Sequence, residues 1–96
     1  MSYRKLVVSN SFQKSYLKFI QRNPDLKANI EEALKELEKD AYSIKLKTHK
    51  LSGKLLGLSA CSCGYDCRII FSIEKLKESN QEVVLLIDIG THDEVY

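Results

Sequence analysis

Residues 65–90, YDCRIIFSIEKLKESNQEVVLLIDIG, decide the fold of this chain. Residues 65–73 alternate in side-chain character and predict a strand. One face of that strand would carry Tyr65, Cys67, Ile69, Phe71 and Ile73, and the other Asp66, Arg68, Ile70 and Ser72. Residues 82–90 are almost continuously apolar, which is typical of a strand near the centre of a sheet. The polar residues 74–81 between the two strands predict a turn.

Two amphipathic helices are predicted in the first half of the chain. Residues 9–23 place Phe12, Tyr16, Phe19 and Ile20 at helical spacing, and Ser9, Asn10 or Ser11 could cap the start. Asn23-Pro24 ends this helix and begins a second one, because proline is tolerated in a first helical turn. The second helix would bury Leu26, Ile30, Ala33, Leu34 and Leu37. So short a connection predicts an antiparallel helical hairpin.

Three further segments complete the predicted fold. Residues 3–9 and 44–51 read as strands, and residues 54–62 as a further strand segment after a turn at Ser52-Gly53. In residues 44–51 the alternation would put Lys45, Lys47 and His49 on one face. The order β-α-α-β-β-β predicts an α+β fold, with a helical hairpin packed on one face of a mainly antiparallel twisted sheet. Residues 1–96 are expected to form a single domain.

Composition narrows the functional classes. The chain has 96 residues and a formal net charge of +2, without the roughly 20 consecutive apolar residues that a membrane span needs. Its N-terminus does not resemble a secretory signal, so we expect a cytoplasmic location and no membrane partner. Residues 41–58 contain no acid but carry Lys45, Lys47, Lys50 and Lys54. Such a basic stripe suits a polyanion-binding surface, and a solvated strand face explains it equally well.

Three cysteines, Cys61, Cys63 and Cys67, lie close together. Their odd number, in a chain without a secretory signal, favours reduced thiols over a disulfide framework. A zinc site built with a histidine is disfavoured, because C-x-C-x3-C lacks the usual C-x2-C spacing. We therefore expect no metal.

The sheet face without helices is predicted to hold a groove with catalytic side chains. His49, Asp66 and Arg68 would line it, and His92 and Tyr96 would emerge at its rim. Such a set suits RNA cleavage, in which the 2′-OH attacks the adjacent phosphate and no cofactor is needed. Histidine and aspartate can exchange the protons, arginine can stabilise the phosphate charge, and an aromatic ring can stack on a base.

Each of these residues also has an ordinary structural explanation. His49 could simply be solvated, and His92 could donate to a carbonyl in a turn. Asp66 and Arg68 have the spacing of a same-face ion pair, and Tyr96 could be frayed. The catalytic interpretation therefore depends on their convergence on one face.

Three stretches, HKLSGKLLG (49–57), YDCRIIFSI (65–73) and LLIDIGTHDEVY (85–96), resemble the RelE/ParE toxin superfamily of type II toxin–antitoxin systems. Within it the elements H-x-L-x-G and I-G-T-H-x-x-x-[YF] are similar to those of the YafQ-like branch. The resemblance implies a small ribonuclease that requires neither metal nor cofactor, enters the ribosomal A site and cuts translated mRNA. It also implies a cognate antitoxin as partner, besides the ribosome and mRNA.

The resemblance also implies roles for individual residues. His92 would be the general acid or the general base, with Asp66 as its complement. His49 would bind the phosphate or orient Asp66. Arg68, which resembles the strand arginine of RelE proper, would stabilise the transition state, and Tyr96 would orient the mRNA. The predicted RNA-binding residues are Lys45, Lys47, Lys50 and Lys54.

One position departs from the pattern of this branch. Ser62 stands where the branch carries a second histidine, four residues before the aspartate. Arg68 would then take over phosphate binding. Two alternatives stay open: a ParE-like inhibitor that binds DNA gyrase without hydrolysis, and a decayed toxin that only binds its antitoxin.

Overall fold

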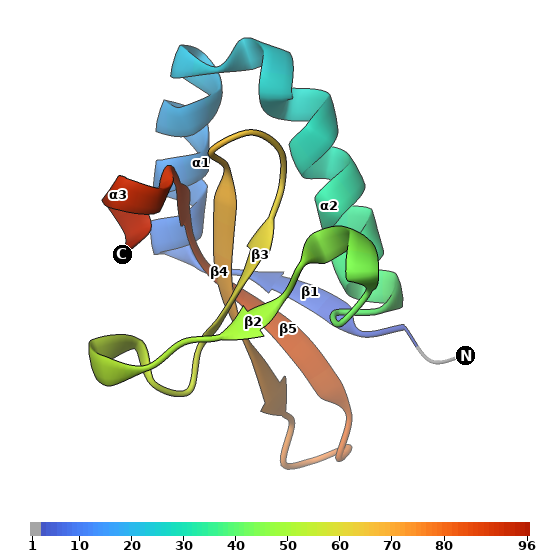
Figure 1. Ribbon diagram of the computed structural model, residues 1–96. Coiled ribbons are helices and arrows are strands. Elements are labelled where there is room, and N and C mark those ends of the chain that lie inside the picture. Colours follow the sequence, from blue (N-terminus) through green and yellow to red (C-terminus); the bar gives the residue numbers. More distant parts are fainter. Residues whose placement is uncertain (1–2) are drawn as a thin grey trace.

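The computed structural model of the protein describes residues 3–96. Five strands form one sheet: β1 (Lys5–Val8), β2 (His49–Lys50), β3 (Ser59–Ser62), β4 (Arg68–Lys75) and β5 (Glu82–Gly90). Three α-helices accompany it: α1 (Asn10–Arg22), α2 (Lys27–Lys39) and α3 (His92–Val95). Short 3₁₀ turns occupy Pro24–Leu26, Ile44–Leu46 and Gly53–Leu55. Figure 1 shows α1 and α2 as a hairpin beside the sheet, with α3 close to α1.

The helical hairpin follows the predicted signals. The Ser9 side chain accepts a hydrogen bond from the backbone N–H of Phe12 at 3.1 Å, which caps the start of α1. At the other end Asn23 terminates α1, and Pro24 opens the 3₁₀ turn that leads directly into α2. Because the connection is so short, both helices turn their apolar stripes toward the same sheet face.

The strand order in the sheet is β1-β5-β4-β3-β2. β1 pairs in parallel with β5, and every other neighbouring pair is antiparallel. β5 has a strand on each side, which confirms the prediction that residues 82–90 lie inside the sheet. The predicted α+β fold with its helical hairpin and mainly antiparallel sheet is therefore confirmed, whereas the chain order has one strand more than predicted and ends in the short helix α3.

The core lies between the hairpin and one face of the sheet. Its buried side chains come from both layers, including Phe12, Phe19, Ile30 and Leu37 from the helices and Ile69, Phe71, Val84 and Leu86 from the strands. Burial of this apolar area is the main force that fixes the helices on the sheet.

The predicted strand over residues 44–51 is wrong. Residues 44–46 form a 3₁₀ turn capped by the Ser43 side chain, and Lys47 has a left-handed backbone with φ of 52°. Ile44 is 90% exposed while Leu46 is buried. The alternation of residue types thus reflects a turn that buries one leucine, and only the two residues of β2 pair with β3.

Three other strands, β1, β3 and β4, are shorter than predicted. The turn predicted at Ser52-Gly53 is present as a 3₁₀ turn, and β3 begins only at Ser59. β4 begins at Arg68, because residues 63–67 form a tight turn. Tyr65 therefore leaves the predicted core face and lies exposed, whereas Ile69 and Phe71 pack against the helices as predicted.

The prediction of three reduced cysteines is wrong for two of them. Cys63 and Cys67 form a disulfide bond, with their Cα atoms 5.1 Å apart across the turn. Cys61 is free and buried. An odd number of cysteines requires one unpaired thiol, but it does not stop two others from pairing where a turn brings them together.

Within residues 3–96, none of the helices has both the length and the apolar composition needed to cross a bilayer.

The packing of α2 on the sheet should contribute to the stability of the fold. Leu37 is fully buried, so Leu37→Ala should lower the free energy of unfolding by about 2–5 kcal/mol. The matched variant Leu17→Ala, whose side chain is 52% exposed on α1, should change it by less than about 0.5 kcal/mol. Urea unfolding followed by circular dichroism measures both, and equal losses would contradict the assigned core.

Candidate active site

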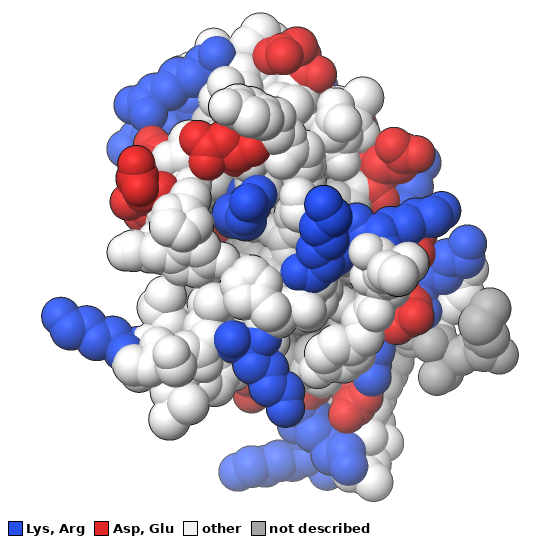
Figure 2. Space-filling model, viewed as in Figure 1, with Lys and Arg blue, Asp and Glu red and all other residues white. Residues whose placement is uncertain are grey.

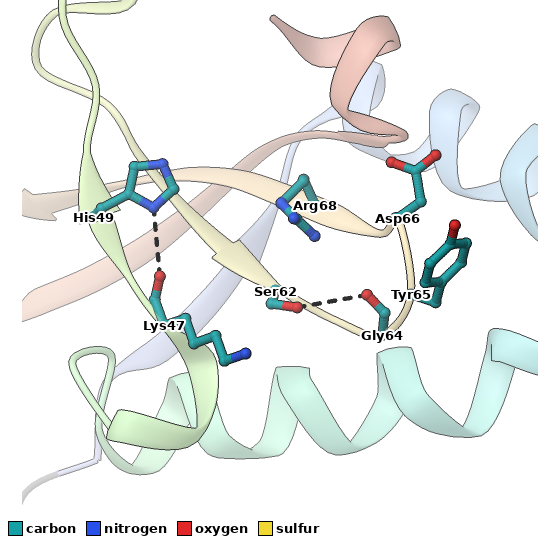
Figure 3. A pocket seen from close by; sticks show the side chains of 7 residues that line it. All are labelled: Lys47, His49, Ser62, Gly64, Tyr65, Asp66 and Arg68. Atoms are coloured by element: carbon teal, nitrogen blue, oxygen red, sulfur yellow. Dashed lines mark hydrogen bonds between the residues drawn. The ribbon is translucent and has the colours of Figure 1, made fainter.

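An open groove lies where β2, the end of β3 and the start of β4 meet (Figure 3). Its volume is about 520 Å³, and its lining residues are Lys47, His49, Ser62, Gly64, Tyr65, Asp66 and Arg68. The structure thus brings three of the predicted catalytic side chains, His49, Asp66 and Arg68, to one hollow. They come from two segments of the chain, His49 from β2 and the other two from the end of the turn that leads into β4 and the first residue of that strand.

Strand register explains why His49 and Arg68 share this groove. His49 pairs with Ala60 across the β2–β3 ladder, and Ser62 pairs with Arg68 across the β3–β4 ladder. Ala60 and Ser62 are two residues apart on β3, so their side chains point to the same face. That face is opposite to the one on which Ile69 joins the core.

A tight turn, residues 63–67, presents Asp66. The Cys63 N–H donates to the Cys67 carbonyl at 2.9 Å, and the disulfide joins the same two residues. Gly64 has a φ of 129°, which glycine adopts without strain, and Asp66 itself is left-handed with φ of 48°. Aspartate tolerates this conformation better than most residues. The Asp66 side chain lies in the groove.

The Asp66 carboxylate connects this turn to α3. Its Oδ1 accepts a hydrogen bond from the backbone N–H of His92 at 3.0 Å. Within α3, Thr91 and Glu94 form a reciprocal capping box. Gly90 makes room for this return of the chain, because a Cβ there would lie 3.0 Å from the Glu94 carboxylate. The first residue of α3 therefore lies where its backbone N–H can donate a hydrogen bond to the Asp66 carboxylate.

Tyr96 lies against both histidines. Its ring packs edge-on against the His92 ring at a centroid distance of 4.6 Å, and its hydroxyl lies 3.3 Å from His49 Nε2. His49 Nδ1 lies 3.4 Å from the Lys47 carbonyl, which can only accept. When the ring is neutral, Nδ1 therefore carries the proton and Nε2 accepts from Tyr96. Burial raises the pKa of the Tyr96 hydroxyl, partly opposed by the Arg68 charge, so this donor keeps its proton at neutral pH.

Two of the non-catalytic explanations, a frayed Tyr96 and an ion pair between Asp66 and Arg68, do not hold in the structure. Tyr96 is packed rather than frayed, and Asp66 bonds to the backbone of His92 rather than to Arg68. His49 contacts Tyr96, whereas no hydrogen bond within residues 3–96 joins it to Asp66, so the expected orientation of Asp66 by His49 is absent.

Arg68 keeps its positive charge available to a ligand. Its Nη1 donates to the Cys67 carbonyl at 3.1 Å, which holds the guanidinium at the groove. None of the ion pairs formed within residues 3–96 includes Arg68. Burial raises the pKa of the neighbouring Cys61 thiol to about 12, so no thiolate neutralises the arginine.

The four predicted RNA-binding lysines surround the groove. Lys47 lines it, and with Lys45 it also lines a hollow against α2. Lys50 and Lys54 line a second hollow that contains His49 and Tyr96. Figure 2, which views this face, shows Lys and Arg side chains spread across it. The lysines and Arg68 make the surroundings of His49 basic, whereas His92 lies beside acids, with Asp93 Oδ1 3.6 Å from its Nδ1.

Two features of the site are not predicted by the sequence analysis. Tyr65 lines the groove although its place in the pattern suggested the core. The sequence THDEVY also folds into a helical turn, and its T-x-x-E spacing of Thr91 and Glu94 is the signal that could have identified it.

Comparison with known proteins identifies the family. A family description, "Bacterial toxin of type II toxin-antitoxin system, YafQ", matches residues 4–96. The chain belongs to the YafQ toxin family. It is thus the toxin of a type II toxin–antitoxin system. The predicted resemblance to the RelE/ParE superfamily and its YafQ-like branch is confirmed. No curated protein matches it in sequence.

Solved structures share the fold of this YafQ-family toxin. YafQ from E. coli strain BL21(DE3) superposes with a TM-score of 0.74 at 17% identity, covering 97% of this chain and 98% of that one. A YoeB/ParE toxin from Agrobacterium tumefaciens gives 0.73 at 15% identity, over 92% and 98% of the two chains. A copper-bound mutant toxin from Helicobacter pylori gives 0.69 at 24% identity, over 97% and 99%. At these identities the likeness shows the fold alone.

The disulfide across the turn makes a prediction about stability. The bond closes a loop with a sequence separation of 4. Reduction should lower the free energy of unfolding by roughly 2 kcal/mol, the value that loop entropy gives for so short a loop. Chemical unfolding with and without a phosphine reductant measures the difference. The double variant Cys63→Ser/Cys67→Ser should not respond to the reductant, and a wild type that does not respond either would contradict the bond.

A salt bridge at α3 makes a prediction about pH. Glu94 lies 3.0 Å from Arg22 on α1. Hydrogen bonds from the Thr91 backbone N–H and hydroxyl, together with the Arg22 charge, lower the pKa of the Glu94 carboxyl from its ordinary value. A lowered pKa means that the ionised form helps to dock α3 above about pH 4.5. This contribution is lost as the pH falls through the lowered value.

Nuclear magnetic resonance can follow the contact between the Tyr96 and His92 rings from pH 5 to pH 3. Wild type should lose ring-to-ring cross-peaks toward the acid end. Glu94→Gln should have weakened cross-peaks already at pH 5 and a smaller change below it. Equal pH responses in the two proteins would show that the effect does not come from Glu94.

Proposed function

We propose that this YafQ-family toxin is a ribosome-dependent endoribonuclease that cleaves translated mRNA without a metal or cofactor. One observation carries the proposal: His49, Asp66 and Arg68 line one open groove, and hydrogen bonds tie the His92 backbone to Asp66 and the Tyr96 hydroxyl to His49. A protein that merely binds a partner has no need of two imidazoles connected in this way to a groove that holds a carboxylate and an arginine.

The reaction would proceed by attack of the RNA 2′-OH on the adjacent phosphorus. A bond forms between O2′ and phosphorus, the bond from phosphorus to O5′ breaks, and the product has a 2′,3′-cyclic phosphate. One group must take the proton from the 2′-OH, and another must give a proton to the departing O5′. No nucleophile from the protein is required.

His92 and Asp66 supply this acid–base pair in our proposal. Asp66 Oδ1 is engaged by the His92 backbone, whereas Oδ2 has no hydrogen-bond partner within residues 3–96. Oδ2 can therefore face the RNA while Oδ1 fixes the distance between the two residues. The exposed His92 ring is supported on one edge by Tyr96 and can reach a ligand.

The remaining residues bind and stabilise the RNA. Arg68 donates to the phosphate as negative charge develops on it, which replaces the function of the histidine that this chain lacks at Ser62. His49 fixes the Tyr96 hydroxyl, so that the tyrosine ring can orient the mRNA. The flanking lysines, Lys45, Lys47, Lys50 and Lys54, bind RNA phosphates.

We also propose a cognate antitoxin as partner. Complexes of E. coli DinJ with YafQ, and the RelBE2 complex of Mycobacterium tuberculosis, have the same toxin fold with an antitoxin bound. The basic face would be complementary to an acidic or groove-covering segment of such a partner.

The test is cleavage of a short mRNA on bacterial ribosomes, read by primer extension. Wild type should produce codon-phased cuts, and His92→Ala should lower the cleavage rate about 10²- to 10⁴-fold, the usual contribution of one general acid or base. Gln21→Ala, exposed on α1 and outside the groove, is the matched control and should cleave normally. Thermal unfolding should show that all three proteins are folded.

Growth arrest on induction separates the alternatives. Arrest by both wild type and His92→Ala with intact mRNA would overturn the ribonuclease in favour of gyrase inhibition. Failure of wild type to arrest growth or to cut mRNA on ribosomes would favour a toxin that only binds its antitoxin.

A further inference from the structure

Tyr65 is the most conspicuous unexplained side chain of the groove. It is 91% exposed, although it is a large aromatic residue directly beside Asp66. Its hydroxyl makes no hydrogen bond within residues 3–96, and its ring is absent from the core cluster. Folding therefore gains almost nothing from this side chain, and its ring is free to contact a ligand in the groove that it lines.

The turn below Tyr65 is firmly built. The disulfide and the 2.9 Å backbone hydrogen bond close it at Cys63 and Cys67. Gly64 packs tightly against the start of α2: a Cβ there would lie 3.2 Å from the side chain of Leu26, which directly precedes the helix, and 3.5 Å from Asn29 within it. An exposed ring on a rigid base loses little conformational entropy when it binds, because only its own two side-chain torsions become fixed.

The position of Tyr65 complements that of Tyr96. Figure 3 shows Tyr65 and His49 at opposite ends of the groove, with Arg68 between them and Asp66 next to Tyr65. Tyr96 is bound to the His49 end through its hydroxyl. One aromatic ring thus stands at each end of the proposed acid–base residues.

We propose that Tyr65 is a base-stacking residue, which binds the nucleobase on the Asp66 side of the cleaved phosphate. This inference rests on the proposed function and adds a second nucleotide position to it. Arg68 and Lys47 would bind phosphates in the same groove, so a neighbouring base lies within reach of the ring. A tyrosine face stacks on any base and more strongly on a purine, because stacking increases with the overlapping ring area. The proposal therefore includes a preference for a purine at this position.

The experiment measures the toxin concentration at half-maximal cleavage rate on ribosomes programmed with a short mRNA. Tyr65→Ala should raise this concentration roughly tenfold, within the range that single base–aromatic stacks contribute. Tyr65→Phe and Tyr65→Trp should restore it, since they keep an aromatic face. Tyr42→Ala, an exposed tyrosine that does not line the groove, is the matched control and should leave it unchanged.

An abasic nucleotide identifies the stacked base. Single abasic sites are placed in turn at the positions flanking the cleaved phosphate. For wild type, one of them should raise the half-maximal concentration about as much as Tyr65→Ala does. In Tyr65→Ala the same abasic site should have no further effect, and the preference for a purine there should disappear. A purely structural role of Tyr65 would not produce this coupling.

Each outcome decides the proposal. If wild type cleaves but Tyr65→Ala behaves identically on all mRNAs, the stacking role is overturned while the proposed function stands. If Tyr65→Ala weakens antitoxin binding or gyrase inhibition but not cleavage, Tyr65 serves a protein partner and the proposal fails. If wild type and His92→Ala both leave mRNA intact, the proposed function fails and the stacking role fails with it.

Discussion

The antiparallel register of β4 and β5, which pairs Arg68 with Gly90, is the constraint on which the site depends. It places the end of β5 beside the start of β4, so that the turn carrying Asp66 and the helical turn beginning at His92 meet. A slip of one residue would send every side chain of β4 to the opposite face. Arg68 would then point into the core, and Asp66 would lose the His92 N–H.

The apolar core holds the sheet and the hairpin together, but polar contacts position the acid–base groups. α3 is a single turn, too short to be stable alone, so its place is set by Asp66, by the capping box and by the salt bridge from Arg22. Hydrogen bonds of this kind contribute about 1 kcal/mol each. The segment that carries His92 and Tyr96 is therefore among the parts of the fold that open most readily.

Much of the fold could be predicted, because its signals are local. The cap at Ser9, the break at Asn23-Pro24 and the apolar run of β5 each act within a few residues, and each appears in the structure. The alternation in residues 44–51 was misleading, since a turn that buries Leu46 and a strand that buries one face give the same pattern. Similarly, the count of cysteines could not show that a turn brings Cys63 and Cys67 together.

The sequence by itself determined the chemical inventory of this protein: two histidines, an aspartate and a tyrosine in an order similar to that of the YafQ-like branch, with an arginine similar to that of RelE. It also determined the helical hairpin and the two longest strands, because helix caps and hydrophobic periodicity are properties of neighbouring residues. Only the tertiary structure decided that Asp66 accepts from the His92 backbone, that Tyr96 bonds to His49 and that Tyr65 is exposed. These contacts join residues as much as 47 positions apart. They depend on strand register and turn geometry, which are fixed by the packing of the whole chain.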